Sequence, residues 1–473
     1  MLEFFSPPAP RERLAADKID KEYRRMRLKV FLGAFFGYAA YYLVRKNLSL
    51  AAPGMMAEGL LDKESAGFAM AGIPIAYAFS KFLMGSLSDH SDARKFLVVG
   101  LIIASSVMMA VGLVPYSSSI AVNAGVLFAF MLAVGWLSGM GWPPCGRIMA
   151  HWFSQNERSF KMSIWNCSHN IGGGSLGLLV SLGIATFAAM GITESWRAAF
   201  IFPSVVAICF AAFCWWTLRD TPESCGLPPI EEYRNDYTSR KAAKGEEQKI
   251  PFRRLFVDYI FKNHLLWMIA IANVFVYFIR YGVSDWAPTY LQEMQILSPD
   301  ESRLAFSLFE YAGIPGTIIC GWLSSKFFDG RCAPVNVIYM LMVLVGILCY
   351  WQAESIAMML GGGEALLKSI VYGALSLTGF AVYGPIALIG IQALSFVPKN
   401  AAGTAAGFVG LFGYLLGDAL LSKIVVGQIA GSAHLGWSAT FWLFTIGCVI
   451  ATSICAITWG KEYRLMNERR LQH

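Results

Sequence analysis

Charged residues are scarce in this chain of 473 residues: Lys, Arg, Asp and Glu make up 15% of it, against about 25% in soluble proteins. Hydrophobic residues make up 56%. Apolar runs of about 20 residues, long enough to cross a bilayer as helices, recur along the chain. The runs are continuous rather than alternating, which excludes a β-barrel. The sequence therefore predicts an all-α membrane protein that crosses the bilayer many times.

Signatures of several enzyme classes are also missing. The ten cysteines form no CxxC pair, and most lie in apolar runs, so we expect buried free thiols. No G-x-x-x-x-G-K-S/T motif is present, which argues against ATP hydrolysis. Neither His151 nor His169 has a convincing nucleophile as a partner, and the sequence around His169 does not suggest a metal site. We therefore expect no catalytic residue, no metal and no cofactor, and we predict that the protein is not an enzyme.

Twelve membrane spans are predicted, in two sets of six. The first six are 29–52, 65–88, 96–115, 119–150, 160–189 and 197–218. The second six are 263–293, 301–328, 334–353, 366–394, 401–430 and 437–460. The chain is thus divided into an N-terminal segment (1–28), two six-helix halves (29–218 and 263–460), a polar central loop (219–262) and a tail (461–473).

The distribution of basic residues predicts the orientation. The net charge of +7 gathers at the N-terminus, in the central loop and in the tail. Loops 51–64 and 354–365 are nearly free of Lys and Arg. The positive-inside rule therefore predicts that both termini are cytoplasmic, in a cell inner membrane, and the charge does not indicate nucleic-acid binding. Residues 1–28 lack the apolar core and cleavage site of a signal peptide, so the first span is expected to direct insertion.

The two halves repeat one another weakly, which is a feature of many transporters. Arg45 lies late in the first span, and Arg280 lies late in the seventh, 235 positions further on (280 − 45). The string GSLSD at 85–89 has a counterpart in GWLSS at 321–325, 236 positions further on (321 − 85). Two landmarks with nearly one offset predict two pseudo-symmetric halves.

Arg45 and Arg280 are the central candidates for substrate binding. A charge inside a membrane helix costs roughly 2.5–3.5 kcal/mol, and it usually faces a cavity or an anionic partner. In a twofold arrangement the two guanidinium groups would face each other and grip a phosphate or carboxylate from both sides. Two alternatives stay open: pairing of the arginines with buried Asp285, Glu310 or Asp418, and snorkelling of Arg45 to the interface near Pro53.

Other polar residues in apolar spans are further candidates. Lys46, Asp285 and Glu310 are expected to form an ion-pair network between the halves, structural or switching. Tyr38, Tyr42 and Arg45, at i, i+4 and i+7, are expected to share one face of a continuous helix. Lys46 points away from that face by about 100°.

The remaining candidates are spread over several spans of both halves. They are Lys81, one turn after Tyr77; Asn166 and His169 of WNCSHNIGGG; and a set of tyrosines, Tyr38, Tyr42, Tyr77, Tyr277, Tyr383 and Tyr414. A histidine between two asparagines in a membrane span suggests a donor to phosphate that titrates near neutral pH. Gly172 to Gly174 are interpreted as a site of close helix packing. Asp89 and Arg94, in the loop GSLSDHSDARK, are expected to act in gating.

Several long strings resemble the organophosphate:phosphate antiporters of the major facilitator superfamily. They include GYAAYYLVRKN (37–47), GMGWPPCGR (139–147), WNCSHNIGGG (165–174), RDTPESCGLPPIEEY (219–233), EYAGIPGT (310–317) and KNAAGTAAGFVGLFGYL (399–415). The resemblance extends from about residue 20 to residue 460 and is strongest to the members that transport glycerol-3-phosphate. It implies a twelve-helix fold with a central site between two halves.

The resemblance also implies a function. External glycerol-3-phosphate would be exchanged for internal inorganic phosphate, with the phosphate group held by Arg45 and Arg280, assisted by His169 and lined by Tyr38, Tyr42, Tyr77 and Tyr277. A monomer is expected to suffice. Asp418 and Lys423 depart from the glycerol-3-phosphate type, so a hexose-6-phosphate antiporter remains an alternative. A membrane receptor that senses a sugar phosphate is another. Ser159 replaces a common glycine, and Ser325 stands where the second half would carry an acid.

Overall fold

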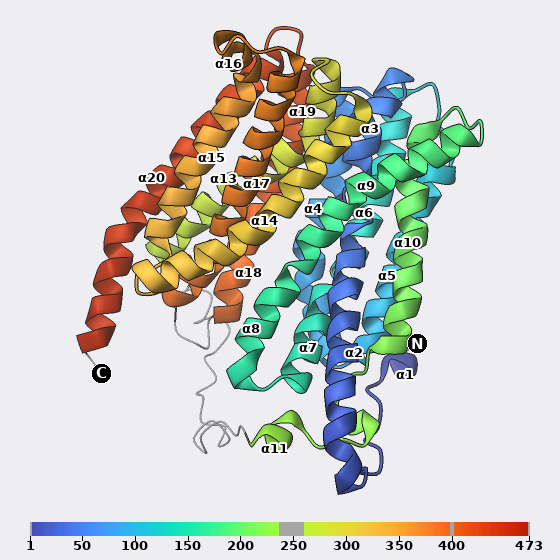
Figure 1. The fold of residues 1–473 in the computed structure, drawn as a ribbon, viewed down its shortest axis with the longest axis vertical. Coiled ribbons are helices and arrows are strands. Elements are labelled where there is room, and N and C mark those ends of the chain that lie inside the picture. The colour runs from blue at the N-terminus through green and yellow to red at the C-terminus, as the bar shows by residue number, and fades with distance from the viewer. Residues whose placement is uncertain (1, 236–259, 398–401, 472–473) are drawn as a thin grey trace.

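The computed structural model describes residues 2–235, 260–397 and 402–471. The described chain is helical, and the ribbon forms two bundles side by side, with both termini at the lower end in Figure 1. We call this the terminal end and the opposite one the distal end. The part of the central loop between 236 and 259 lies outside the described residues.

The N-terminal bundle follows the predicted first half. Its helices are α2 (Ala16–Tyr42), α3 (Asn47–Ala57), α4 (Lys63–Asp89), α5 (Ala93–Leu113), α6 (Ile120–Ser138), α7 (Trp142–Trp152), α8 (Gln155–Asn166), α9 (Ser168–Ala189) and α10 (Ala198–Thr217). The short elements α1 (Leu2–Phe5), η1 (Ser195–Arg197), η2 (Glu223–Cys225) and α11 (Ile230–Arg234) flank them.

The C-terminal bundle contains the second half. Its elements are α13 (His264–Glu293), α14 (Pro299–Phe327), α15 (Ala333–Trp351), α16 (Ala353–Met359), α17 (Glu364–Ser395), α18 (Ala402–Phe412), the π-helix η5 (Gly413–Val425), α19 (Val426–Gly431) and α20 (Gly436–Leu471). The described residues contain ten helices long and apolar enough to cross a membrane, or eleven if the two parts of α4, bent by 45°, count as one span.

The internal repeat extends to the helix ends. Asp62 caps α4 in a reciprocal capping box, and Ser298 does the same for α14, 236 positions further on (298 − 62). Pro53 in α3 and Pro288 in α13 are 235 positions apart (288 − 53). Both offsets agree with that of the two arginines, so the halves share start signals as well as charges.

The first span is not the continuous helix that the sequence predicted. The helix α2 ends at Tyr42, and α3 begins only at Asn47, so Arg45 and Lys46 lie in a turn between them. The Asn47 side chain stabilises the break: its amide donates to the carbonyl oxygens of Leu43, at 3.0 Å, and Ala199, at 2.8 Å. Arg45 therefore does not continue the helical face of Tyr38 and Tyr42. The predicted continuous helix is therefore wrong, although the Arg45 guanidinium still lies over the ring of Tyr42, at 4.9 Å.

The halves meet across two equivalent pairs of spans, α4 against η5 and α9 against α14. Contact is closest toward the distal end. A Cβ on Gly67 would lie 2.3 Å from the carbonyl oxygen of Lys423, and one on Gly177 would lie 2.6 Å from that of Arg303. Lys63 also pairs with Glu293 across the halves at 2.6 Å. Side chains larger than glycine would separate the halves here.

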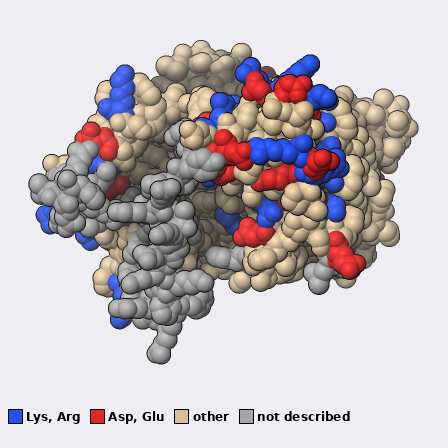
Figure 2. Space-filling view, turned by 90° about the horizontal axis from the view of Figure 1, so that it is seen from below, with Lys and Arg blue, Asp and Glu red and all other residues tan. Residues whose placement is uncertain are grey.

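The terminal end differs. Seen from this end, the described surface is hollowed between the two halves (Figure 2). Among the described residues, the ion pairs that join the two halves are Lys46–Asp285, Lys46–Glu310 and Lys63–Glu293. None of these three lies at the terminal end, so the halves are held together in the middle and at the distal end.

The glycines of WNCSHNIGGG pack helices together, as the sequence predicted. A Cβ on Gly172 would lie 2.1 Å from the carbonyl oxygen of Ala39 in α2. A Cβ on Gly174 would lie 2.7 Å from the ring of Tyr311 in α14. This stretch therefore brings α9 against helices of both halves.

Candidate anion-binding site

Arg280 is buried in the middle of α13, with 3% of its surface exposed. Its Nη2 donates to the hydroxyl of Tyr383 at 3.1 Å, and its guanidinium lies over the rings of Tyr281 and Tyr383 at 4.6 and 4.5 Å. Its Nε is buried without a hydrogen-bond partner. No carboxylate of the described residues lies within ion-pair distance of it. A buried guanidinium with an unused donor is suited to bind an anion.

Arg45 lies in the turn between α2 and α3, in the opposite half. Its guanidinium stands over the rings of Tyr42 and Tyr77, at 4.9 and 4.3 Å. Within the described part of the chain it also forms no ion pair with a carboxylate. Aromatic faces attract the cation without neutralising its charge. Each half therefore contributes one arginine held by tyrosines and left without a counter-ion.

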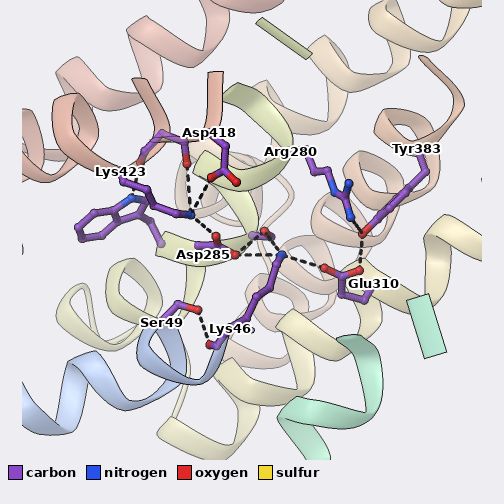
Figure 3. Close-up of polar contacts among 11 residues, drawn as sticks. Lys46, Ser49, Arg280, Asp285, Glu310, Tyr383, Asp418 and Lys423 are labelled. Atoms are coloured by element: carbon purple, nitrogen blue, oxygen red, sulfur yellow. Dashed lines mark hydrogen bonds and ion pairs between the residues drawn. The ribbon is translucent and has the colours of Figure 1, made fainter. Parts of the chain in front are cut away.

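The lysines, by contrast, are neutralised. The Nζ of Lys46 lies 3.0 Å from carboxylate oxygens of both Asp285 and Glu310, and it donates to Ser284 at 2.9 Å. Figure 3 shows these contacts as part of a chain of polar side chains. The ion pairs predicted between Lys46, Asp285 and Glu310 are present, and they join the turn after α2 to α13 and α14. A switching role for them stays a prediction.

Asp418 and Lys423 extend this network. Lys423 donates to Asp285, and its Nζ lies 3.4 Å from Asp418 (Figure 3). In an α-helix, residues five apart point about 140° away from each other. Both residues lie in η5, and the π-helix has i→i+5 hydrogen bonds, so five residues make about one turn. Sequence reasoning noticed the two charges but had no signal for the π-helix that brings them together.

Tyr383 connects the network to Arg280. Its hydroxyl donates to Glu310, whose other carboxylate oxygen accepts from Lys46 (Figure 3). The same hydroxyl accepts from Arg280. A ligand that draws Arg280 away from Tyr383 therefore acts on a group that also holds Glu310. The sequence placed Tyr383 among the cavity tyrosines but gave it no such linking role.

His169 lies between the two halves. Its ring centroid is 5.5 Å from that of Tyr42 and 5.7 Å from that of Tyr383. Its Nδ1 contacts the carbonyl oxygen of Asn166, which leaves Nε2 for another partner. Asn166 ends α8, and Cys167 separates this helix from α9. For Asn166 the structure thus shows a backbone role, in orienting the His169 ring.

The predicted tyrosines fall into two groups. Tyr77 and Tyr277 pack edge-on against Tyr414, at 4.9 and 5.0 Å, which brings side chains of both halves into contact, with Tyr277 one turn before Arg280 in α13. Tyr38 packs against Trp165 at 4.7 Å and against Tyr42 at 5.5 Å. Lys81 lies one turn beyond Tyr77, exposed, with its Nζ 6.0 Å from the ring of Trp142.

Asp89 and Arg94, the two residues expected to act in gating, form no ion pair with each other. Asp92 instead caps α5 by accepting from the backbone of Arg94, and its carboxylate lies 4.0 Å from that side chain. Asp220, from the segment after α10, accepts from the backbone of Ala93 and from the Nε and Nη2 atoms of Arg147. Asp89 is exposed at the end of α4, so the N-terminus of α5 takes the two nearer carboxylates.

The charges of the site are therefore divided between two sets. The network contains two lysines and three carboxylates, a net charge of −1 (2 − 3). Arg45 and Arg280 lie beside it, and neither has a counter-ion among the residues that the structure describes. A cavity of about 30 Å³ is lined by residues of both sets. Two helical halves around a central charged site define a membrane transporter.

Comparison with known proteins agrees with this class. Residues 34–422 match the Major Facilitator Superfamily. The chain is 46% identical over 464 residues, 98% of its length and 99% of the relative's, to the glycerol-3-phosphate transporter of Bacillus subtilis (strain 168). It is 33% identical to a probable hexose phosphate transport protein of Chlamydia pneumoniae, over 97% of each chain.

A solved structure gives the same fold. It is the structure of a bacterial homolog of the human lysosomal transporter Spinster in an inward-facing, unoccupied conformation. The alignment covers 93% of this chain and 97% of that chain, with 16% identity and a TM-score of 0.65. The chain belongs to the Major Facilitator Superfamily. The predicted fold class is thereby confirmed, and the protein is a transporter of that family rather than an enzyme.

Proposed function

We propose that this protein transports a small organophosphate, glycerol-3-phosphate, across the cell inner membrane in exchange for inorganic phosphate. The observation that supports this most directly is the difference between the cations of the site. Within the described part of the chain, Lys46 and Lys423 are paired with carboxylates, while Arg45 and Arg280 are not. The names of the relatives at 46% and 33% identity, one for each kind of phosphate ester, point to the same ligand class.

A phosphate monoester fits two unpaired arginines. It carries a charge of about −1.5 to −2 at neutral pH and three acceptor oxygens. Each guanidinium can donate two parallel hydrogen bonds to such a group. An ammonium offers a point charge instead, so the arginines are assigned the phosphate and the lysines the network. His169, whose Nε2 is free of the contact with Asn166, is assigned a third donor.

Exchange follows from repulsion between the arginines. With the site empty, two like charges in a low-dielectric cleft repel each other, and bound phosphate removes this repulsion. The cavity of about 30 Å³ has room for about one water molecule. Binding of an organophosphate therefore requires the halves to move, and the loaded site favours their closure. The ion pairs of Lys46 with Asp285 and Glu310 are the contacts proposed to break and reform as the two halves move relative to each other.

The proposed topology places both termini in the cytoplasm, with a monomer as the functional unit. The terminal end, where the surface is hollowed, is then the cytoplasmic side (Figure 2). Hexose-6-phosphate remains the second candidate substrate, because Asp418 and Lys423 place a further charged pair at the cavity. A sugar-phosphate receptor would keep the same site but give little flux.

The test is exchange of radiolabelled phosphate in proteoliposomes. Arg280→Lys keeps the charge but loses a bidentate donor, a charge-assisted bond of about 1.5–3 kcal/mol, so exchange should fall about 10- to 150-fold or more. Arg197→Lys is the control, because Arg197 contacts only its own half, through Glu194, Gly112 and Val114. Substantial exchange by Arg280→Lys, or equal loss in both variants, would contradict the assignment.

Competition identifies the organic group. Unlabelled glycerol-3-phosphate should reduce labelled phosphate exchange at a lower concentration than glucose-6-phosphate or phosphoenolpyruvate. A lower concentration for glucose-6-phosphate would support the hexose phosphate alternative. Tight binding with little flux in the same vesicles would support the receptor.

A further inference from the structure

A second basic pocket lies at the terminal end, separate from the central site. Its volume is about 380 Å³. Its lining contains five cations and three acids, Arg11, Arg25, Lys29, Arg94, Arg219, Glu22, Asp92 and Asp220, a net charge of +2 (5 − 3). Charged side chains gather on this face of the protein (Figure 2).

The acids of the pocket are already engaged. Asp220 binds the Arg147 guanidinium at 3.0 and 3.1 Å, and Asp92 accepts from the backbone of α5. Glu22 pairs with Arg25 at 3.3 Å. Among the described residues, Arg11, Lys29 and Arg219 have no carboxylate within ion-pair distance. Burial and the neighbouring charge of Arg94 lower the pKa of the Arg219 guanidinium, as expected where cations crowd together.

The pocket is built rather than fortuitous. Its outer wall is the segment before α2, which is fixed to the segment after α10 by backbone bonds. Arg11 donates to the carbonyl oxygen of Glu223 and Leu14 donates to that of Gly226, both at 2.9 Å. Gly226, at φ 75°, would bring a Cβ within 2.5 Å of the Glu12 carbonyl oxygen, so this contact requires glycine.

The pocket also lies at the edge of the membrane-spanning region. Arg219 follows α10 by two residues, and Arg94 is the second residue of α5. Trp215 and Trp216, 43% and 64% exposed, lie beside the pocket. Arg94 stands over the ring of Trp215 at 4.6 Å, and Lys29 stands over that of Trp216 at 4.0 Å. Exposed tryptophans at a span end mark the headgroup level of a bilayer.

We propose that this pocket binds the phosphate headgroup of an anionic phospholipid from the leaflet on the side of the termini. Unpaired cations supply the attraction, the two tryptophans mark the depth, and acyl chains would extend along the exposed end of α10. Basic pockets of this kind between membrane helices suit phosphate headgroups. A soluble phosphate shares the chemistry, and the experiment separates the two sources.

The experiment uses the full-length protein in detergent, with phosphatidylglycerol as probe and phosphatidylcholine as the neutral comparison. Native mass spectrometry and lipid-dependent thermal stability report binding. Removing two cations in Arg11→Gln/Arg219→Gln should weaken phosphatidylglycerol binding about 30-fold, which is about 2 kcal/mol at 1.4 kcal/mol per tenfold. Lys18→Gln/Lys21→Gln, which removes two exposed cations of α2 outside the pocket, should bind as wild type does.

Two outcomes would overturn the proposal. Unchanged phosphatidylglycerol binding in the double variant would exclude this pocket. Displacement of the lipid by inorganic phosphate, or protection by phosphate that the double variant loses, would assign the pocket to a soluble anion. If the double variant does not fold, Arg11→Gln alone serves, because its side chain forms no hydrogen bond or ion pair with the described residues, and a drop of about fivefold is expected.

Discussion

Removing Lys423 should destabilise the protein strongly, because two buried carboxylates depend on it. Lys423 and Asp418 are each 4% exposed, and Lys423 is the cation within ion-pair distance of Asp418 among the described residues. Among the described residues, Asp285 would keep Lys46 as its one cation, together with the hydrogen bond from Ser284. In Lys423→Met the network changes from two lysines and three carboxylates to one and three, a charge of −2 (1 − 3). Removing one partner of a buried ion pair costs about 3–5 kcal/mol of stability, which is a large part of the typical free energy of unfolding of about 5–15 kcal/mol.

Asp418→Asn should behave in the opposite way. It leaves two lysines with two carboxylates, so the network becomes neutral (2 − 2). The Oδ1 atom of Asp418 lies 3.4 Å from Lys423 but accepts no hydrogen bond, and Lys423 keeps Asp285 as its partner, so little is lost with the charge of Asp418. We expect a change within about 1 kcal/mol. The double variant Asp418→Asn/Lys423→Met also removes the carboxylate that Lys423→Met leaves unpaired. Part of the lost stability should therefore be recovered, with a coupling energy between the two substitutions of about 0.5–3 kcal/mol.

The assay is denaturant unfolding in mixed micelles, followed by tryptophan fluorescence, for the wild type and the three variants as one cycle. Phosphate exchange in proteoliposomes serves as the second readout. Wild-type stability in Lys423→Met, or simple addition of the two single effects in the double variant, would refute the view that Lys423 neutralises these carboxylates.

Two further predictions concern the distal end and the terminal end. Gly67→Val should push α4 away from η5, because a Cβ at this position would lie 2.3 Å from the Lys423 carbonyl oxygen. Spin labels placed across the distal end should then move apart, and phosphate exchange should slow. Gly85→Val is the control, because the space around Gly85 is open, and it should change neither the spin-label distance nor the exchange rate. Burial raises the pKa of Glu157, but the hydrogen bond and charge of Arg27 outweigh it, so the pKa lies below its ordinary value of 4.5. The stability from this pair is present above pH 4.5 and lost as the pH falls further. The thermal midpoint of wild type should therefore fall more than that of Glu157→Gln between pH 6 and pH 3.5. An equal fall of the two midpoints over this pH range would contradict the stabilising role of the Arg27–Glu157 pair.

The charged network could be predicted from the sequence in part. Lys46, Asp285 and Glu310 lie in apolar spans, where an unpaired charge is costly, so pairing follows from composition alone. The repeat offset supplied Arg280 as the counterpart of Arg45. The sequence left open whether the arginines pair with Asp285, Glu310 or Asp418, and in the described structure neither arginine has a carboxylate partner. The structure shows that the lysines take these acids.

The local breaks could not be predicted. The sequence around Arg45 contains no proline or glycine between Tyr38 and Gly54 apart from Pro53, and the turn at 43–46 depends on Asn47 reaching a carbonyl of α10. The π-helix η5 has no known sequence signature, and only its register brings Asp418 to Lys423. Asp92 and Asp220, rather than Asp89, accept hydrogen bonds from the backbone N–H groups that begin α5. Asp220 is distant in the sequence, so only the folded chain places it at this helix end.

The central claim is that Arg45 and Arg280 together hold the phosphate group. A structure of the full-length protein with glycerol-3-phosphate bound tests it most directly. The account predicts phosphate oxygens about 2.7–2.9 Å from both guanidinium groups, with Lys46 and Lys423 still paired to Asp285. A phosphate group bound to Lys46 or Lys423, with Arg280 still donating to Tyr383 alone, would contradict it.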